Sequence, residues 1–312
     1  MKIIDTHCDL LYQMFRNPKV QFEQGDGEAD VSYSRLKKAG VVLQWFAIYL
    51  PDDPRYYSFE HVLACIDLFR TRIAACPQVH VVRNREDLST SLAEGKLGVM
   101  LTLEGVEGLA ANISHLRTAY DLGVRSIGIT WNHANWAADG VGEPRLGGFT
   151  LRGKAFVQEC DRLGIVLDVS HLSEKGFWEL CELSPRPFIA SHSNAYQICA
   201  HRRNLKDDQI RAIIQKKGRI GITFVPAFVR PEEPQIKDLL LHIDHICSLG
   251  GEERIGFGSD FDGMDDKIPG LEHPAHYSRL ADELHKRYTN EQAERFLFGN
   301  WNSYLLQNLP EA

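Results

Sequence analysis

Short apolar segments alternate with stretches of helical periodicity along most of the chain. The segments are continuous apolar runs rich in β-branched and aromatic residues, as are strands buried on both faces of a parallel sheet. Strands are therefore expected at residues 2–7, 41–49, 98–103, 125–130, 165–170, 187–191, 219–225 and 254–259. Because helix candidates separate most of these runs, the pattern predicts repeated parallel βαβ units.

Capping residues predict where several helices begin and end. Ser173 precedes one helical stretch, and Asp207 or Asp208 precedes another. Thr289 begins a third helix with capping-box spacing, and Gly299 is expected to end it. These signals place helices between the expected strands.

The number of units decides between two α/β folds. About eight βα units in 312 residues favour a (β/α)8 TIM-like barrel over an open doubly wound sheet. No glycine-rich phosphate loop follows an early strand, which counts against a dinucleotide-binding fold. We expect one barrel domain over residues 1–312.

Histidine and carboxylate residues follow several expected strands at the point where each strand ends. They are His7, Asp9, Glu104, His171, His192 and Asp260. Barrel enzymes carry their chemistry at the C-terminal ends of the strands, so these side chains are expected to meet. His7 and Asp9 alone would also fit an ordinary strand-to-loop exit. All six together predict a metal site, because carboxylates at one barrel mouth repel one another unless a cation lies among them.

The number of ligands points to two metal ions. Three histidines and three carboxylates exceed what one tetrahedral zinc requires. They suit two metals roughly 3.5–4 Å apart that share a bridging carboxylate and a bridging hydroxide.

Other segments near the strand ends leave alternatives open. The aromatic loop from Trp131 to Trp136 fits either internal packing or the wall of a pocket. Arg202 and Arg203 fit either a solvated basic pair or a clamp for a substrate carboxylate. The proline-rich residues 226–236 form a loop that could line or cover a site. Two pairs have helical spacing away from strand ends and are interpreted as surface helix residues: His61 with Cys65, and His242 with His245.

Composition narrows the partners and the compartment. A formal net charge of −7 argues against nucleic acid or an acidic membrane as the main partner. The seven cysteines are scattered and contain no CxxC pair, which fits a reducing compartment. No secretory signal, apolar tail or 18-residue apolar run is recognised, so a cytoplasmic protein without a membrane partner is expected.

Six motifs carry a resemblance to a known family. They are Asp5-Thr6-His7-Cys8-Asp9, Leu103-Glu104-Gly105, Asp168-Val169-Ser170-His171, Ser191-His192-Ser193-Asn194-Ala195-Tyr196, Arg202-Arg203-Asn204-Leu205 and Gly258-Ser259-Asp260-Phe261-Asp262-Gly263. In this order, from Asp5 to about Met264, the chain resembles the membrane dipeptidase (renal dipeptidase) family of metal-dependent hydrolases. The spacing of eleven residues between His192 and Arg203 is the most specific part.

The resemblance implies an activity and a role for each matching residue. The family cleaves dipeptides and often accepts a D residue at the C-terminal side, with two Zn²⁺ ions per subunit in a homodimer. His7 and Asp9 would bind one zinc, His171 and His192 the second, and Glu104 would bridge them. The resemblance further implies that Asp260 would transfer the proton and that Arg203 would bind the terminal carboxylate of the substrate.

Two positions depart from the family pattern. Trp131 stands where many relatives have a histidine, with His133 two residues later. Phe228 stands where some relatives have a tyrosine. With Arg203, these three are the expected substrate-binding residues. The missing secretion signal and lipid anchor fit a microbial cytosolic form. Two other functions stay open: another amide or ester hydrolase, such as a lactamase-like enzyme or deaminase, and a non-catalytic binding protein.

Overall fold

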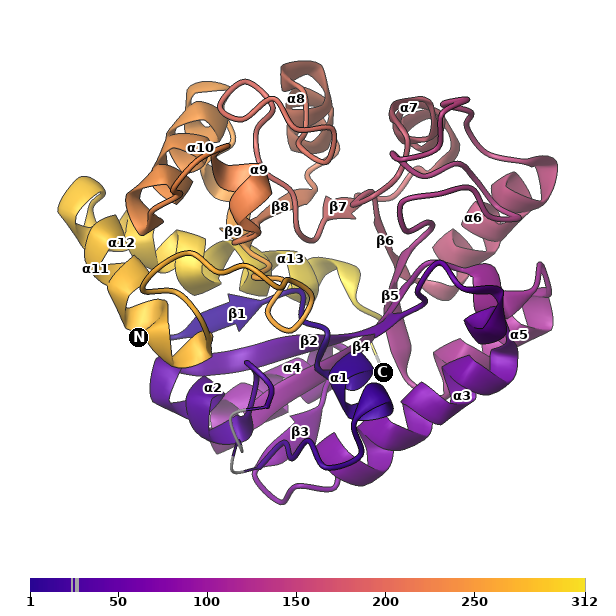
Figure 1. The fold of residues 1–312 in the computed structure, drawn as a ribbon, viewed down its shortest axis with the longest axis horizontal. Coiled ribbons are helices and arrows are strands. Elements are labelled where there is room, and N and C mark those ends of the chain that lie inside the picture. The colour runs from indigo at the N-terminus through magenta and orange to yellow at the C-terminus, as the bar shows by residue number, and fades with distance from the viewer. Residues whose placement is uncertain (24, 26–27, 312) are drawn as a thin grey trace.

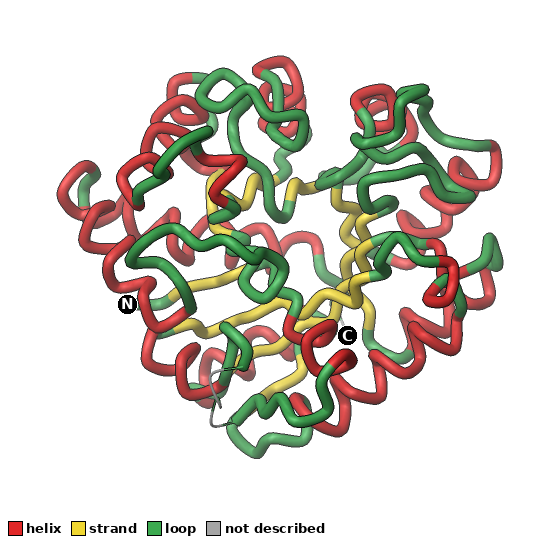
Figure 2. The backbone as a smooth tube through the Cα atoms, in the orientation of Figure 1, coloured by secondary structure: helices red, strands yellow, loops and turns green. Residues whose placement is uncertain are grey.

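A closed parallel barrel forms the centre of the molecule (Figures 1 and 2). The structure, a computed structural model, describes residues 1–23, 25 and 28–311. Within these ranges, the barrel strands follow the order β2-β1-β9-β8-β7-β6-β5-β4, and β2 pairs with β4 to close the ring. The strands are β1 Ile3–Asp5, β2 Val41–Tyr49, β3 Val79–Val81, β4 Leu97–Glu104, β5 Val124–Gly128, β6 Val166–Asp168, β7 Ile189–Ala190, β8 Arg219–Ile222 and β9 Ile255–Phe257. The predicted (β/α)8 barrel is confirmed.

The strand β3 lies outside the closed ring and was not predicted. It pairs with the first residues of β4, with Val79 opposite Leu97. Three residues with a histidine in the middle do not form a recognisable apolar run. The expected strands themselves are all present, but most are shorter than expected. β7 has only two residues and meets β6 through a single pair, Asp168 with Ile189.

Helices surround the strands (Figure 1). They are α1 Leu10–Arg16, α2 Tyr33–Ala39, α3 Phe59–Leu68, α4 Arg85–Glu94, α5 Ile113–Asp121, α6 Leu151–Leu163, α7 Glu174–Leu183, α8 Asp207–Gln215, α9 Pro226–Val229, α10 Ile236–Ser248, α11 Tyr277–Arg287, α12 Asn290–Glu294 and α13 Asn300–Asn308. No helix in the described ranges has both the length and the hydropathy that crossing a membrane requires.

The capping predictions have mixed outcomes. Ser173 and Thr289 cap α7 and α12, each accepting a backbone N–H from three residues ahead. The helix α8 begins at Asp207, so its N-cap is Lys206 rather than an aspartate. Gly299 does not end a helix, because it has ordinary helical geometry (φ −59°) and the chain continues from α12 through one π-helical turn into α13.

The helix α13 fills one end of the barrel interior with a side chain. Alternate residues of β4 face inward, so Met100 packs with Trp45 and with Trp301 of α13 in one buried cluster. The rings of Trp45 and Trp301 lie 5.7 Å apart. Gly256 makes room for this contact, since a Cβ there would lie 2.1 Å from Trp301 Nε1. This packing leaves only the opposite end of the barrel for a site.

Three of the residues assigned to helix surfaces are buried. His61 and Cys65 lie on the inner face of α3, and His242 of α10 is completely buried. His242 Nδ1 accepts the Ala195 N–H at 3.1 Å, and its Nε2 lies 2.9 Å from the Val229 carbonyl. The surface interpretation was wrong for these three, because helical spacing alone does not show which face packs on the barrel.

Candidate active site

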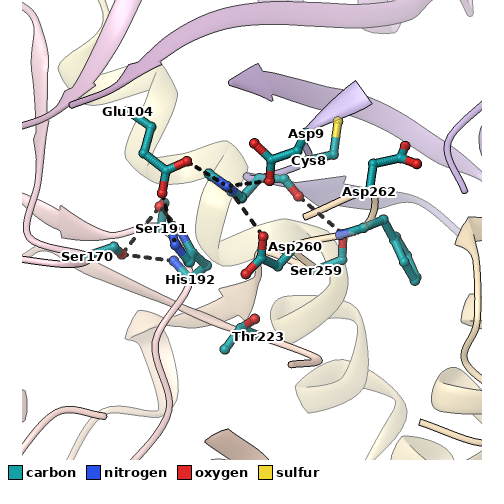
Figure 3. A network of polar contacts seen from close by, with 12 residues as sticks. Cys8, Asp9, Glu104, Ser170, Ser191, His192, Thr223, Ser259, Asp260 and Asp262 are labelled. Carbon is teal, nitrogen blue, oxygen red and sulfur yellow. Dashed lines mark hydrogen bonds and ion pairs between the residues drawn. The ribbon is translucent and has the colours of Figure 1, made fainter. Parts of the chain in front are cut away.

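The six side chains expected to form a metal site lie together at the C-terminal end of the barrel. His7 and Asp9 follow β1, and Glu104 ends β4. The other three follow β6, β7 and β9. Counted with its backbone, none of the six residues is more than 9% exposed. Figure 3 shows Asp9, Glu104, His192 and Asp260 converging on one space.

Glu104 lies between His7 on one side and the pair His171 and His192 on the other. Its Oε2 lies 3.6 Å from His7 Nε2, while its Oε1 lies 3.0 Å from His171 Nε2 and 3.5 Å from His192 Nε2. His7 Nε2 also lies 3.3 Å from Asp9 Oδ2 and 3.6 Å from Asp260 Oδ1. One carboxylate therefore faces both halves of the cluster.

Hydrogen bonds behind two histidines fix which ring nitrogen faces the cluster. His171 Nδ1 lies 2.9 Å from Asn132 Oδ1, an atom that can only accept. His192 Nδ1 lies 2.7 Å from the hydroxyl of Ser191, which itself donates to buried Asp168. Both Nδ1 atoms are therefore the protonated ones, and both Nε2 atoms present lone pairs to the cluster.

The donor set fits metal cations. The lone pairs of His171 Nε2 and His192 Nε2 face each other at 3.0 Å, which is repulsive unless a cation lies near them. His7 Nε2 and Asp9 Oδ1 are buried without a hydrogen-bond partner. Buried polar atoms without partners are costly, and nitrogen and carboxylate ligands of this kind bind zinc and related ions.

Electrostatics supports the same interpretation. Burial raises the pKa of Glu104 to about 8 and that of Asp260 to about 7. Burial lowers the pKa of His7, but the carboxylates of Glu104 and Asp9 outweigh it and raise the pKa to about 10. Without a metal ion, bound protons therefore offset the repulsion among these carboxylates.

Backbone hydrogen bonds join the loop of Asp260 to the loop after β1. The Asp260 N–H donates to the carbonyl of His7 at 3.2 Å, and the Asp9 N–H donates to the carbonyl of Phe261 at 2.9 Å. Gly263 passes close to both carboxylates, since a Cβ there would lie 2.2 Å from Asp9 Oδ2. The two loops thus hold Asp9 and Asp260 side by side.

A cavity of about 550 Å³ opens onto the cluster. Arg203, Trp131 and Phe228 line it, together with Asp260. Arg203 is 6% exposed and its guanidinium lies 5.4 Å from the ring of Phe228. Burial lowers its pKa to about 10, so it stays charged at neutral pH. A solvated basic pair therefore describes exposed Arg202 but not Arg203.

The aromatic loop after β5 forms one wall of this cavity. The ring of Trp131 packs edge-on against Tyr49 at 5.2 Å, and it lies 6.0 Å from that of His171. His133 also lines the cavity, but its side chain is 56% exposed and lies 3.5 Å from Asp52. Of the proline-rich residues 226–236, Phe228 reaches the cavity as part of the short helix α9.

Four residues near the cluster were not assigned a role from the sequence. Asn132, Ser191 and Asp168 orient His171 and His192, and His201 lines the cavity beside Arg203. Ser191 and Asp168 lie at strand ends, a signal that could have identified them. Asn132 and His201 lie in loops whose path the sequence does not give.

Comparisons with known proteins agree with this arrangement. Residues 1–303 match the model of the membrane dipeptidase family, peptidase family M19. A solved structure of a dipeptidase, described as a metallopeptidase of family M19, is 29% identical with a TM-score of 0.91, and the match covers 100% of this chain and 99% of that one.

Two bacterial proteins have the same fold. A metallopeptidase from Rhodobacter sphaeroides, solved with a phosphinate mimic of L-Ala-D-Ala, is 28% identical with a TM-score of 0.90 over 99% of both chains. An amidohydrolase from Pseudomonas aeruginosa, 20% identical with a TM-score of 0.84 over 98% of this chain and 96% of its own, shares the fold. The chain therefore belongs to the membrane dipeptidase family, peptidase family M19, and is a metal-dependent dipeptidase.

Proposed function

We propose that this protein is a binuclear zinc dipeptidase that hydrolyses L,L and L,D dipeptides. The position of Glu104 carries the proposal, because its two oxygens face different histidines. A carboxylate in this position suits a bridge between two metal ions.

The proposed ligands divide into two sets around Glu104. His7 and Asp9 would bind one zinc, and His171 and His192 would bind the other. Imidazole nitrogens with carboxylate oxygens are ordinary zinc ligands. When bound, the two ions would lower the pKa of a water molecule toward neutrality and so supply hydroxide, and they would polarise the scissile carbonyl.

Asp260 is proposed as the general acid–base. Its side chain is 13% exposed, compared with 6% for Asp9 and 8% for Glu104, so it is the carboxylate of the cluster most open to the cavity. From there it would take the proton of the attacking water and deliver it to the leaving amine.

Arg203 is proposed to bind the terminal carboxylate of the dipeptide. It lines the same cavity as Asp260, and a planar guanidinium suits a carboxylate. Trp131, Phe228 and His133 would form the other substrate contacts. Cleavage of L,D dipeptides is supported by the Rhodobacter sphaeroides relative, which was solved with a phosphinate mimic of L-Ala-D-Ala.

Metal content measured alongside hydrolysis tests the proposal. We expect about two zinc ions per chain, with hydrolysis of L-Ala-L-Ala and L-Ala-D-Ala lost after chelation and restored by zinc. Full activity after complete metal removal would contradict it. Glu104→Gln should lower the zinc content, whereas Glu107→Gln is the matched control. Glu107 is also buried, but it hydrogen-bonds to Asn135.

The role of Arg203 has its own test. Arg203→Ala should lower kcat/KM for dipeptides by about 100-fold, mainly through KM, because the carboxylate loses a charge-assisted hydrogen-bond partner. C-terminally amidated dipeptides should be poor substrates of the wild type and should lose much less in the variant. Efficient cleavage of amidated dipeptides by the wild type would instead favour a broader amide hydrolase.

The homodimer and the cytoplasmic location stay predictions from the sequence. Light scattering of the zinc-loaded protein would show a mass of about two chains if the first is right. Cell fractionation would test the second.

A further inference from the structure

His201 lies in the cavity wall beside Arg203. It belongs to the loop that connects β7 to α8, and both residues line the cavity that opens onto the cluster. The side chain is partly exposed, and no role was predicted for it.

Two contacts hold the imidazole of His201 in one orientation. Its Nδ1 accepts the backbone N–H of Arg203 at 3.2 Å. Its ring stacks on Phe228, with 4.5 Å between ring centres and 26° between the planes. The ring can therefore neither flip nor swing away without losing a contact.

These contacts also determine where the proton lies. Burial, together with the charges of Arg203 and Arg202, lowers the pKa of His201, so the ring is neutral at neutral pH. Because Nδ1 is an acceptor, the single ring proton is on Nε2. Among the described residues, Nε2 has no hydrogen-bond partner, which leaves it free to donate to a ligand.

Arg203 packs on the same phenylalanine as His201. Its Nη2 donates to the carbonyl of His192, while its buried Nε has no partner. Its guanidinium lies near the same Phe228 ring that supports His201. Two side chains of one loop that carry N–H donors thus pack on one aromatic ring in the wall of one cavity. A carboxylate, with two oxygens and about four lone-pair positions, suits such a pair.

We propose that His201 is a further substrate-binding residue, which donates its Nε2–H to the C-terminal carboxylate that Arg203 binds. This inference rests on the proposed dipeptidase function. It also gives the cavity a histidine that is fixed in place, whereas His133 is mostly exposed at its edge.

Two substitutions separate the donor from the structural contact. In His201→Asn, the amide oxygen can take the place of Nδ1 and accept from Arg203, but no donor reaches the position of Nε2. In His201→Gln, the amide nitrogen can take the place of Nε2. His115→Asn is the matched control, because His115 also stacks on a phenylalanine, Phe59, but lies away from the cavity.

The first measurement is kcat/KM of the zinc-loaded enzyme for L-Ala-D-Ala and its C-terminal amide. His201→Asn should lose about tenfold or more for the free acid, through KM, with a smaller loss for the amide. His201→Gln should retain most of the wild-type value, and His115→Asn should retain all of it. Equal losses in Asn and Gln variants, equal losses for both substrates, or an unchanged KM in His201→Asn would overturn the proposal.

The second measurement does not depend on turnover. Calorimetry should show that the phosphinate mimic of L-Ala-D-Ala binds about tenfold more weakly to His201→Asn than to the wild type, with zinc content unchanged. Equal affinity would overturn the role of His201. If the wild type bound the mimic but hydrolysed no dipeptide, the dipeptidase proposal would fail while the carboxylate contact would still be measured.

Discussion

Three residues at the site other than glycine have left-handed backbone. His171, Asp260 and Asp262 have φ of 70°, 69° and 69°. Such conformations cost about 1–3 kcal/mol each and persist only where their surroundings hold them. The carboxylate of Asp262 provides part of that support, because it accepts the N–H groups of Asp30 at 2.6 Å and Val31 at 3.0 Å. These contacts therefore help to hold the loop that directs Asp260.

Gly263 offers a test of how closely the carboxylates must be placed. In Gly263→Ala, the new Cβ would lie 2.2 Å from Asp9 Oδ2 and 2.4 Å from Asp260 Oδ1, so both carboxylates must shift. Because a displacement of about 1 Å in a catalytic group can cost 100-fold, we expect kcat/KM to fall by about that factor and zinc affinity to fall with it.

The control for this variant is Gly299→Ala. Gly299 is helical, and the nearest atom to a new Cβ lies 3.5 Å away. Stability should rise by about 0.5–1 kcal/mol without a change in kcat/KM. Equal activity of the two variants would show that the Gly263 loop accommodates the methyl group.

Residue types at strand ends were the most informative part of the sequence. His7, Glu104 and His192 follow apolar runs, so barrel geometry alone brings them together. His201 could not be found in this way. It follows β7 by eleven residues in an irregular loop, and its place depends on Phe228 from the next βα unit.

At the level of elements, α10 holds two active-site loops together. His242 bonds both Ala195, in the loop after β7, and Val229, at the end of α9. Asn204 adds a bond from its side chain to the Phe228 carbonyl at 2.8 Å. The loop after β7 and the helix α9, which carry Arg203 and Phe228, thus depend on a buried histidine that must stay neutral.

This dependence predicts a pH effect on stability. Burial lowers the pKa of His242 below its usual value of about 6.5, so below that pH the unfolded chain binds a proton that the folded chain excludes. The stabilisation is present above pH of about 6.5 and is lost as pH falls through the folded-state pKa. His242→Gln should reduce the decrease in urea midpoint between pH 7 and pH 5.

The control is the exposed His285 of α11. His285→Gln should leave the pH dependence of the urea midpoint as it is in the wild type. The assignment to His242 would fail if both variants had the wild-type pH dependence.

The sequence predicted the elements that repeat along the chain as apolar runs. It did not predict features that depend on a single short segment or on one residue. Eight apolar runs correspond to the eight barrel strands. β3 has no such run, because it pairs with only one strand and has a histidine at its centre. Gly299 was misread because glycine permits a helix end without requiring one. The burial of His242 depends on how α10 rotates against the barrel, which a spacing of three or four residues does not determine.

For the whole molecule, α13 ties the end of the chain to the middle of the barrel. Trp301 is fully buried against Trp45, and Arg85 of α4 donates to the carbonyl of Leu309 at 2.8 Å. We propose on this basis that residues 1–312 unfold as one domain.

Trp301→Ala tests this proposal. The cavity left by the indole should cost about 3–5 kcal/mol. A single denaturation transition should shift to lower urea, and the KM for dipeptides should stay unchanged. Two separate transitions in the wild type, or a variant of unchanged stability, would contradict the one-domain proposal.

The two-residue strand β7 meets β6 through a single residue pair, as β1 meets β9. The backbone ladder is brief, and Asp168 supplements it by accepting the N–H groups of Ser170 and Ser191, each at 2.9 Å. The same carboxylate accepts from the Ser191 hydroxyl behind His192. We therefore expect that local opening of the barrel between β6 and β7 also misorients His192. Hydrogen exchange at the Ser191 amide would measure how often this local opening occurs and, with it, how often the active site is briefly inactive.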